Sequence, residues 1–177
     1  MNKALYIPIT SEEVQEVEGL LLTHCGAQMK NVWLLGVNIG CRTNELLRMK
    51  FSDIHGDLIQ VMRTRAHQTR NLNYYLTPAA KEIILNISKD NPQDEFIFQY
   101  HKSRVIKSNL PKPISSHAVN KAFKDVGDIL NVNLLPHSMR AILRDNLLVH
   151  YSSANLYLES FYSSIQSNEL KIIQADN

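Results

Sequence analysis

Arginine side chains lie beside expected helix starts in this chain, and a guanidinium beside free backbone N–H groups suits a bound phosphate. In the segment 36–46 an apolar run stops at Gly40, and a second helical pattern begins near Thr43. Gly40 lets the backbone turn, Arg42 lies in the break, and Thr43 is expected to cap the new helix, whose amide groups would face the same way as Arg42. The alternative is a kink between two core helices with a solvated arginine.

A second arginine lies at another expected helix start. The segment 135–140 places Pro136 in a first helical turn. His137 and Arg140 are three residues apart, which puts them on one helical face. Two arginine pockets, one of them with a histidine, could converge on one phosphodiester. The spacing therefore predicts a phosphate site built from Arg42, His137 and Arg140.

The elements that must position these residues are mainly helical. Thr10 and Glu13 have the spacing of a capping box, and the helix they start is expected to end at Gly26. A second helix is expected over 32–39 and a third over 45–51. Glu45 is expected either to orient Arg42 through an ion pair or to be solvated. The remaining expected elements are a helix over 79–87, a short strand over 95–98, a basic mobile loop over 101–113, a long helix capped by Ser115 or Ser116, a helix over 137–149, and one or two amphipathic helices within 151–177.

Residues 53–77 alternate between apolar and polar with period two, which predicts strands and a hairpin. The tip of this hairpin is basic, and its charged or titratable residues are Arg63, Arg65, His67 and Arg70. A basic tip can reach a DNA groove. The alternative is a solvated turn.

Composition is that of an ordinary globular protein: 177 residues, 44% hydrophobic and 20% charged, enough for one domain with a real core. The net charge of +2 permits nucleic-acid binding without requiring it. Cys25 and Cys41 lack metal-site spacing, so we expect buried thiols in a reducing, cytoplasmic compartment, with no metal or cofactor. The start of the chain lacks the apolar run of a signal peptide, and no stretch is apolar enough to span a membrane.

Taken in order, these motifs resemble the catalytic domain of the tyrosine recombinases, the phage-integrase family. The resemblance covers about residues 9–148. The similar segments are 40–47 for the family's first arginine motif, 50–54 for the segment that ends it, 137–140 for the HxxR motif, and 94–98 and 114–117 for connecting segments.

The resemblance implies an α+β fold, mainly helical with a small antiparallel sheet. The chain would be a single domain over 1–177 without the family's N-terminal core-binding domain. The implied function is site-specific DNA recombination or integration, as in a mobile element, on double-stranded DNA. Self-association on that DNA and a cytoplasmic, nucleoid-associated location are further expectations.

The resemblance also implies a mechanism. A tyrosine attacks a DNA phosphate and forms a phosphotyrosyl link, while Arg42 and Arg140 hold the non-bridging oxygens. His137 would hydrogen-bond the phosphate or shuttle a proton. The family's hairpin lysine is missing, because no lysine lies between Lys50 and Lys81. His67 or Gln68 occupies roughly its place, and the hairpin arginines are poor proton donors.

The nucleophile depends on how the C-terminal region is laid out. Without gaps, Tyr162 falls where the family has His or Trp, and the window 170–173 expected for the nucleophile holds no tyrosine. The chain would then keep the fold without its nucleophile. With a gap, 150–153 is the third motif, and Tyr162 is a better nucleophile candidate than Tyr157. The alternatives to an active recombinase are a DNA-binding accessory or regulatory protein on this fold, and a helical interaction protein without a DNA role.

Overall fold

The computed structural model describes residues 10–65, 68–101 and 110–150. The chain divides into two compact units, 1–143 and 144–177. The first unit holds all the residues that line the pocket described below. The expectation that 1–177 forms a single recombinase-like domain stays a prediction.

The chain begins with two helices, α1 (Ser11–Cys25) and α2 (Ala27–Ile39). The predicted capping box is confirmed, since the Thr10 hydroxyl accepts from the Glu13 N–H and the Glu13 carboxylate accepts from the Thr10 N–H, each at 3.1 Å. Gly26 ends α1 as predicted. Gly40 ends α2 in the left-handed conformation, at φ 68° and ψ 18°, which glycine adopts without a steric penalty.

The third helix is shorter than the predicted 45–51. It runs as α3 (Thr43–Leu47) and is followed by the 3-10 turn η1 (Phe51–Asp53). The backbone leaves the helix because it pairs with a distant segment: the N–H of Ile97 donates to the Met49 carbonyl at 3.0 Å, and that of Phe51 to Glu95 at 3.2 Å. The predicted capping role of Thr43 is wrong, since the N-cap residue is Arg42.

The predicted hairpin is confirmed as part of a three-stranded antiparallel sheet in the order β1-β2-β3. The strands are β1 (Ile54–His55), β2 (Leu58–Arg65) and β3 (Gln68–Tyr75). Ile59 and Val61 on β2 are buried, whereas Leu58 and Met62 are exposed, so the sheet has one inner and one outer face. Ile59 lies opposite Tyr74 on β3.

Three further helices follow, α4 (Pro78–Asp90), α5 (Ser116–Ile129) and α6 (Ser138–His150). Thr77 and Ser115 cap α4 and α5 through their hydroxyl groups. Because α6 begins at Ser138, His137 lies in the turn before the helix and not on a helical face as predicted. The predicted strand at 95–98 is wrong, since this segment makes only one isolated bridge, between Phe96 and Lys50. Most of the expected basic loop, at 102–109, and the expected C-terminal helices within 151–177 lie outside the described residues.

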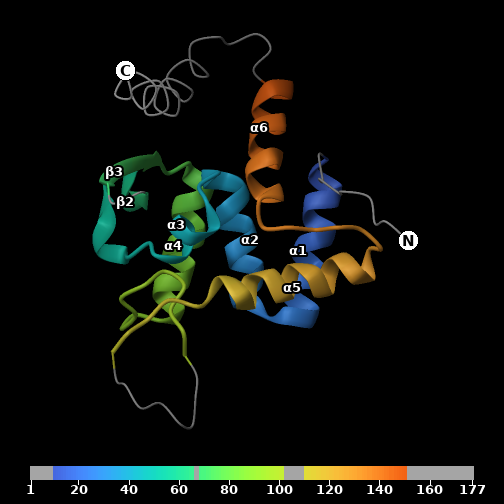
Figure 1. The fold of residues 1–177 in the computed structure, drawn as a ribbon, viewed down its shortest axis with the longest axis horizontal. Coiled ribbons are helices and arrows are strands. Elements are labelled where there is room, and N and C mark those ends of the chain that lie inside the picture. Colours follow the sequence, from blue (N-terminus) through green and yellow to red (C-terminus); the bar gives the residue numbers. More distant parts are fainter. Residues whose placement is uncertain (1–9, 66–67, 102–109, 151–177) are drawn as a thin grey trace. The chain divides into compact units, whose positions relative to one another are not determined.

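The core of the first unit forms around α2, which contacts α1, α3, α4 and α5 (Figure 1). Trp33 on α2 packs edge-on against Phe123 on α5, with ring centroids 5.6 Å apart. Cys41 is buried as predicted, whereas Cys25 is only half-buried, and both are free thiols. Among the described helices, none combines the length and the apolar character needed to cross a membrane.

The start of α6 packs closely on α2 through glycine positions. Gly36 is buried, and a Cβ atom there would overlap the sulfur of Met139. A Cβ at Gly40 would lie 2.5 Å from a methyl group of Leu143. The glycines therefore set how near α6 comes to the turn that carries Arg42.

Candidate functional site

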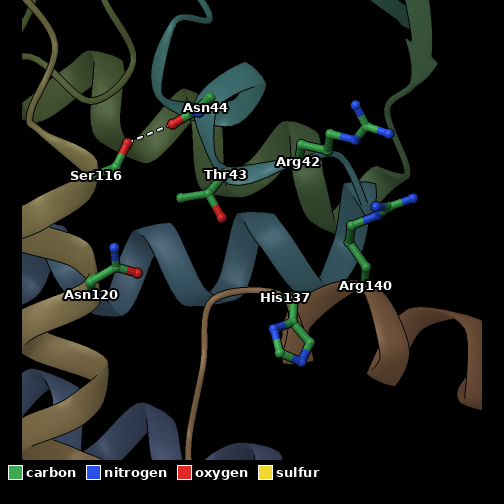
Figure 2. Close-up of a pocket in the computed structure, with 7 residues that line it drawn as sticks. All are labelled: Arg42, Thr43, Asn44, Ser116, Asn120, His137 and Arg140. Atoms are coloured by element: carbon green, nitrogen blue, oxygen red, sulfur yellow. Dashed lines mark hydrogen bonds between the residues drawn. The ribbon is translucent and has the colours of Figure 1, made fainter.

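A hollow of about 380 Å³ lies where the α2–α3 turn, the start of α5 and the start of α6 meet (Figure 2). We call it the arginine pocket. Its lining residues are Arg42, Thr43, Asn44, Ser116, Asn120, His137 and Arg140. The three residues that the sequence predicted for one site thus come together, although 42 and 137 belong to distant parts of the chain.

The two arginines extend toward the same side of the pocket in Figure 2. Both residues are exposed, and within the described part of the chain neither guanidinium forms an ion pair with a carboxylate. The Nε–H of Arg140 donates to the Gly40 carbonyl at 3.1 Å, which fixes the side chain and leaves its terminal nitrogens for other partners. Two such cations in one hollow create a site for an anion.

His137 lines the same pocket, but its imidazole points away from the two guanidinium groups in Figure 2. It lies in the turn before α6, where its carbonyl accepts from the N–H of Arg140 at 3.1 Å. The backbone of this turn therefore holds His137 and Arg140 at a fixed separation.

The sequence did not predict the neutral polar residues of the pocket, Asn44, Ser116 and Asn120. The Ser116 hydroxyl donates to the side-chain oxygen of Asn44 at 2.5 Å and so ties the start of α5 to α3. The signal that could have found Ser116 is its place next to the Ser115 cap, at the first residue of a predicted helix.

Glu45 belongs to α3, which begins at the pocket residue Thr43, and its side chain is only 6% exposed. Its carboxylate accepts from the backbone N–H of Arg42 at 3.0 Å, from Nε of Arg63 at 2.5 Å and from the Tyr74 hydroxyl at 2.6 Å. We call these four residues the Glu45 cluster. Both sequence-based alternatives for Glu45 are wrong: it is not solvated, and its ion-pair partner is Arg63 and not the Arg42 side chain.

The Glu45 cluster shifts the pKa values of its members. Burial, the largest influence, raises the pKa of Glu45, but the hydrogen bonds from Arg63, Tyr74 and the Arg42 amide together bring it below its ordinary value. Burial and the hydrogen bond to Glu45 raise the pKa of the Tyr74 phenol. Burial lowers the pKa of Arg63, but the bond to Glu45 outweighs it and the net shift is upward. The cluster is therefore a carboxylate–guanidinium pair with a neutral phenol.

Comparison with known proteins identifies the family. Residues 3–155 match the model of the phage integrase family. The chain belongs to the phage integrase family. No curated protein sequence matches the chain significantly.

Solved structures of integrases are similar to this family member in fold. The lambda integrase catalytic core gives a TM-score of 0.61 at 18% identity, covering 85% of this chain and 86% of that one. The Tn1549 transposon integrase in complex with circular intermediate DNA gives 0.62 at 13% identity, covering 86% and 55%. A lambda integrase dimer bound to a COC′ core site gives 0.59 at 17% identity, covering 86% and 43%. The chain thus spans less than half of that last protein.

These likenesses confirm the predicted fold, mainly helical with a small antiparallel sheet. Three of the family segments quoted from the sequence, 40–47, 114–117 and 137–140, contribute residues to the arginine pocket. The catalytic roles of their residues stay predictions.

The structure describes only some of the hairpin residues that were predicted to contact DNA. Arg63 belongs to the Glu45 cluster, and Arg70 lies opposite it on β3 and is half-buried. The side chain of Arg65, all of His67 and the nucleophile candidate Tyr162 lie outside the described residues. Their roles also stay predictions.

Proposed function

We propose that this phage integrase family member binds double-stranded DNA with one backbone phosphate in the arginine pocket. The observation that supports this best is the pair of exposed guanidinium groups of Arg42 and Arg140 on one hollow, neither of which forms an ion pair with a carboxylate in the described part of the chain (Figure 2). Arginine is suited to this because its planar fork donates to two phosphate oxygens at once. The basic hairpin residues Arg63, Arg65, His67 and Arg70 would add contacts to the same duplex.

In the leading form of the proposal the protein is a site-specific recombinase. The Tyr162 phenol loses its proton and its oxygen attacks phosphorus, and the bond from phosphorus to the 5′-oxygen breaks as the new bond to tyrosine forms. The leaving 5′-oxygen takes up a proton, and reversal of the two steps rejoins a strand. The arginines stabilise charge on the phosphoryl oxygens, and His137 would hydrogen-bond the phosphate or shuttle a proton.

The second candidate is a non-catalytic DNA-binding accessory or regulatory protein on the same fold. Two observations favour it. No lysine lies between Lys50 and Lys81. On the hairpin, Nε of Arg63 is already bound to Glu45. A family member that lacks the hairpin lysine would still bind DNA through the arginine pocket.

The wider expectations belong to the same proposal. Several similar integrases were solved on DNA, one of them as a dimer on its core site. By analogy we propose self-association of this chain on DNA, action in a mobile element, and a cytoplasmic, nucleoid-associated location.

A salt titration with duplex DNA tests the binding. Fluorescence anisotropy at low salt should show affinity that falls steeply as salt rises, because each neutralised phosphate releases counterion. Arg42→Ala should weaken binding about tenfold and reduce the salt slope by about one. Arg48→Ala removes the same charge from an exposed residue outside the pocket and is the matched control.

Arg140→Lys refines the test, because it keeps the charge but loses both the bidentate fork and the Nε bond to Gly40. It should weaken binding nearly as much as an alanine. No affinity at low salt contradicts the proposed function and favours an interaction protein without a DNA role. Equal effects of Arg42→Ala and Arg48→Ala on DNA affinity contradict the arginine pocket as the phosphate site.

A further inference from the structure

We propose that the Glu45 cluster couples the β2–β3 hairpin to the arginine pocket, with Arg63 and Tyr74 as positioning residues for Arg42. This inference rests on the proposed function of the pocket. It assigns a role to Tyr74 and gives Arg63 a role beyond its predicted contact with DNA.

The coupling runs through one carboxylate. Oε1 of Glu45 accepts from Arg63 on β2, and Oε2 accepts from Tyr74 on β3 at 2.6 Å. Oε2 also accepts from the backbone N–H of Arg42 at 3.0 Å. A single buried side chain therefore holds both strands of the hairpin and the backbone of a pocket residue.

The position of Arg63 in the sheet makes this attachment strong. Arg63 follows Ile59 and Val61 with period two and so lies on the inner face of β2. Tyr74 lies opposite Ile59 and is half-buried on the same face. The buried charge is that of Glu45, whose side chain is 6% exposed against 28% for Arg63, and an unpaired buried charge is strongly unfavourable. The hairpin therefore cannot shift far without breaking the contact to Glu45.

The other end of the coupling is the backbone of Arg42. Its carbonyl accepts from the N–H groups of Glu45 and Leu46, both at 2.9 Å, and its own N–H is held by the Glu45 carboxylate. These bonds fix the Cα of Arg42, while its exposed side chain lines the pocket and extends toward the same side as that of Arg140 (Figure 2). A displacement of Glu45 by the hairpin would move the point from which the guanidinium reaches a phosphate.

The competing explanation is a buried ion pair that only stabilises the fold. The two explanations differ in one measurable respect. A positioning role acts through Arg42, so its effect on DNA affinity disappears when the Arg42 side chain is absent. A stabilising role is independent of that side chain.

A double-mutant cycle on DNA affinity distinguishes them. Tyr74→Phe removes the hydroxyl bound to Glu45 and keeps the ring. It should weaken duplex binding about 3-fold in the wild-type background and leave the affinity of Arg42→Ala nearly unchanged. Tyr75→Phe is the matched control, because the neighbouring phenol is 42% exposed on the outer face, and it should change neither background.

Thermal unfolding of each variant shows that the folded protein is being titrated. If Tyr74→Phe does not fold, Arg63→Lys enters the same cycle, because it keeps the charge and loses the Nε donor. Equal effects of Tyr74→Phe in both backgrounds, or none in either, overturn the coupling and leave DNA binding by the pocket intact. No effect of Arg42→Ala itself overturns the proposed function, and the coupling with it.

Discussion

Glu45 is a buried carboxylate in the midst of three donors, and this arrangement decides its charge. Desolvation alone would favour the protonated acid. The guanidinium of Arg63, the phenol of Tyr74 and the amide of Arg42 all donate to it, and donors favour the carboxylate. The net effect is a pKa below the ordinary value of 4.5. The folded state is therefore stabilised by the ionised form of this one residue.

This stabilisation has a defined pH dependence. Because folding lowers the pKa of Glu45, its contribution is complete above the ordinary value of 4.5 and is lost as the pH falls through the folded pKa. We expect urea unfolding from pH 7 to pH 3 to show a free energy of unfolding that falls steeply below about pH 4.5.

Glu45→Gln should be less stable at pH 7 and show a shallower acid dependence, since it has no proton to take up. Glu82→Gln is the matched control, because Glu82 is exposed on α4. If the free energy of unfolding falls equally with decreasing pH in wild type and in Glu45→Gln, Glu45 is not the ionised group that stabilises the folded state.

At the scale of elements, the packing of α6 on α2 fixes the pocket. Arg140 is in the first turn of α6, and its Nε donates to the carbonyl of Gly40 at the end of α2. Gly36, one turn earlier, lies against Met139. A change in the spacing of these two helices would therefore move Arg140 relative to Arg42.

Gly36→Ala tests this packing. A Cβ at Gly36 would overlap the Met139 side chain, which is fully buried and has little room to move. We expect a loss of about 1–3 kcal/mol in the free energy of unfolding, measured by urea denaturation. Duplex affinity should fall as well, because α6 carries Arg140.

The matched control is Gly19→Ala, which lies in α1 with nothing within 4 Å of a new Cβ. Alanine is a better helix former than glycine, so this variant should gain roughly 0.5–1 kcal/mol. Stabilisation by both substitutions would show that α6 does not pack on Gly36 as described.

Local signals in the sequence predicted the elements well where the cause was local. The Thr10 capping box, the helix ends at Gly26 and Gly40 and the period-two hairpin all depend on residues a few positions apart. The length of α3 was not predicted, because the backbone just after this helix, at 49–51, forms hydrogen bonds with 95–97 far along the chain. The start of α6 was misplaced by one residue, which moved His137 out of the helix.

The candidate site was likewise predicted only in part. The motif spacing predicted that Arg42, His137 and Arg140 would share a pocket, and they do. The partners of Glu45 were missed, since Arg63 and Tyr74 are 18 and 29 residues further along the chain. The alternation of β2 already placed Arg63 on the inner face, where a partly buried charge favours a partner of opposite charge. That signal could have predicted a carboxylate there, although not which one.

For the whole molecule, the decisive test is whether a tyrosine attacks the phosphate held in the arginine pocket. If Tyr162 is the nucleophile, wild-type protein should form a covalent complex with a nicked suicide DNA substrate, visible as a band that resists denaturing electrophoresis. Tyr162→Phe should abolish that band and leave duplex affinity unchanged, because it removes only the attacking oxygen. Tyr157→Phe is the control, since it keeps the favoured candidate.

A wild-type protein that binds duplex DNA but yields no covalent band on nicked substrates supports the accessory or regulatory protein. A band that survives in Tyr162→Phe and disappears in Tyr157→Phe assigns the other tyrosine.

Mixing two inactive variants shows which copy of the chain supplies the tyrosine. Tyr162→Phe keeps an intact arginine pocket, and Arg140→Ala keeps an intact tyrosine. If the tyrosine acts on a phosphate held by its own chain, each pocket in the mixture still lacks one of the two groups, and no covalent band forms. If a neighbouring copy on the DNA donates the tyrosine, the Arg140→Ala chain can attack a phosphate held by the Tyr162→Phe chain. A recovered band, with the tyrosine of the Arg140→Ala chain attached to DNA, would establish exchange between copies. Such exchange requires self-association on DNA, because a pocket and a tyrosine on separate chains must meet at one phosphodiester.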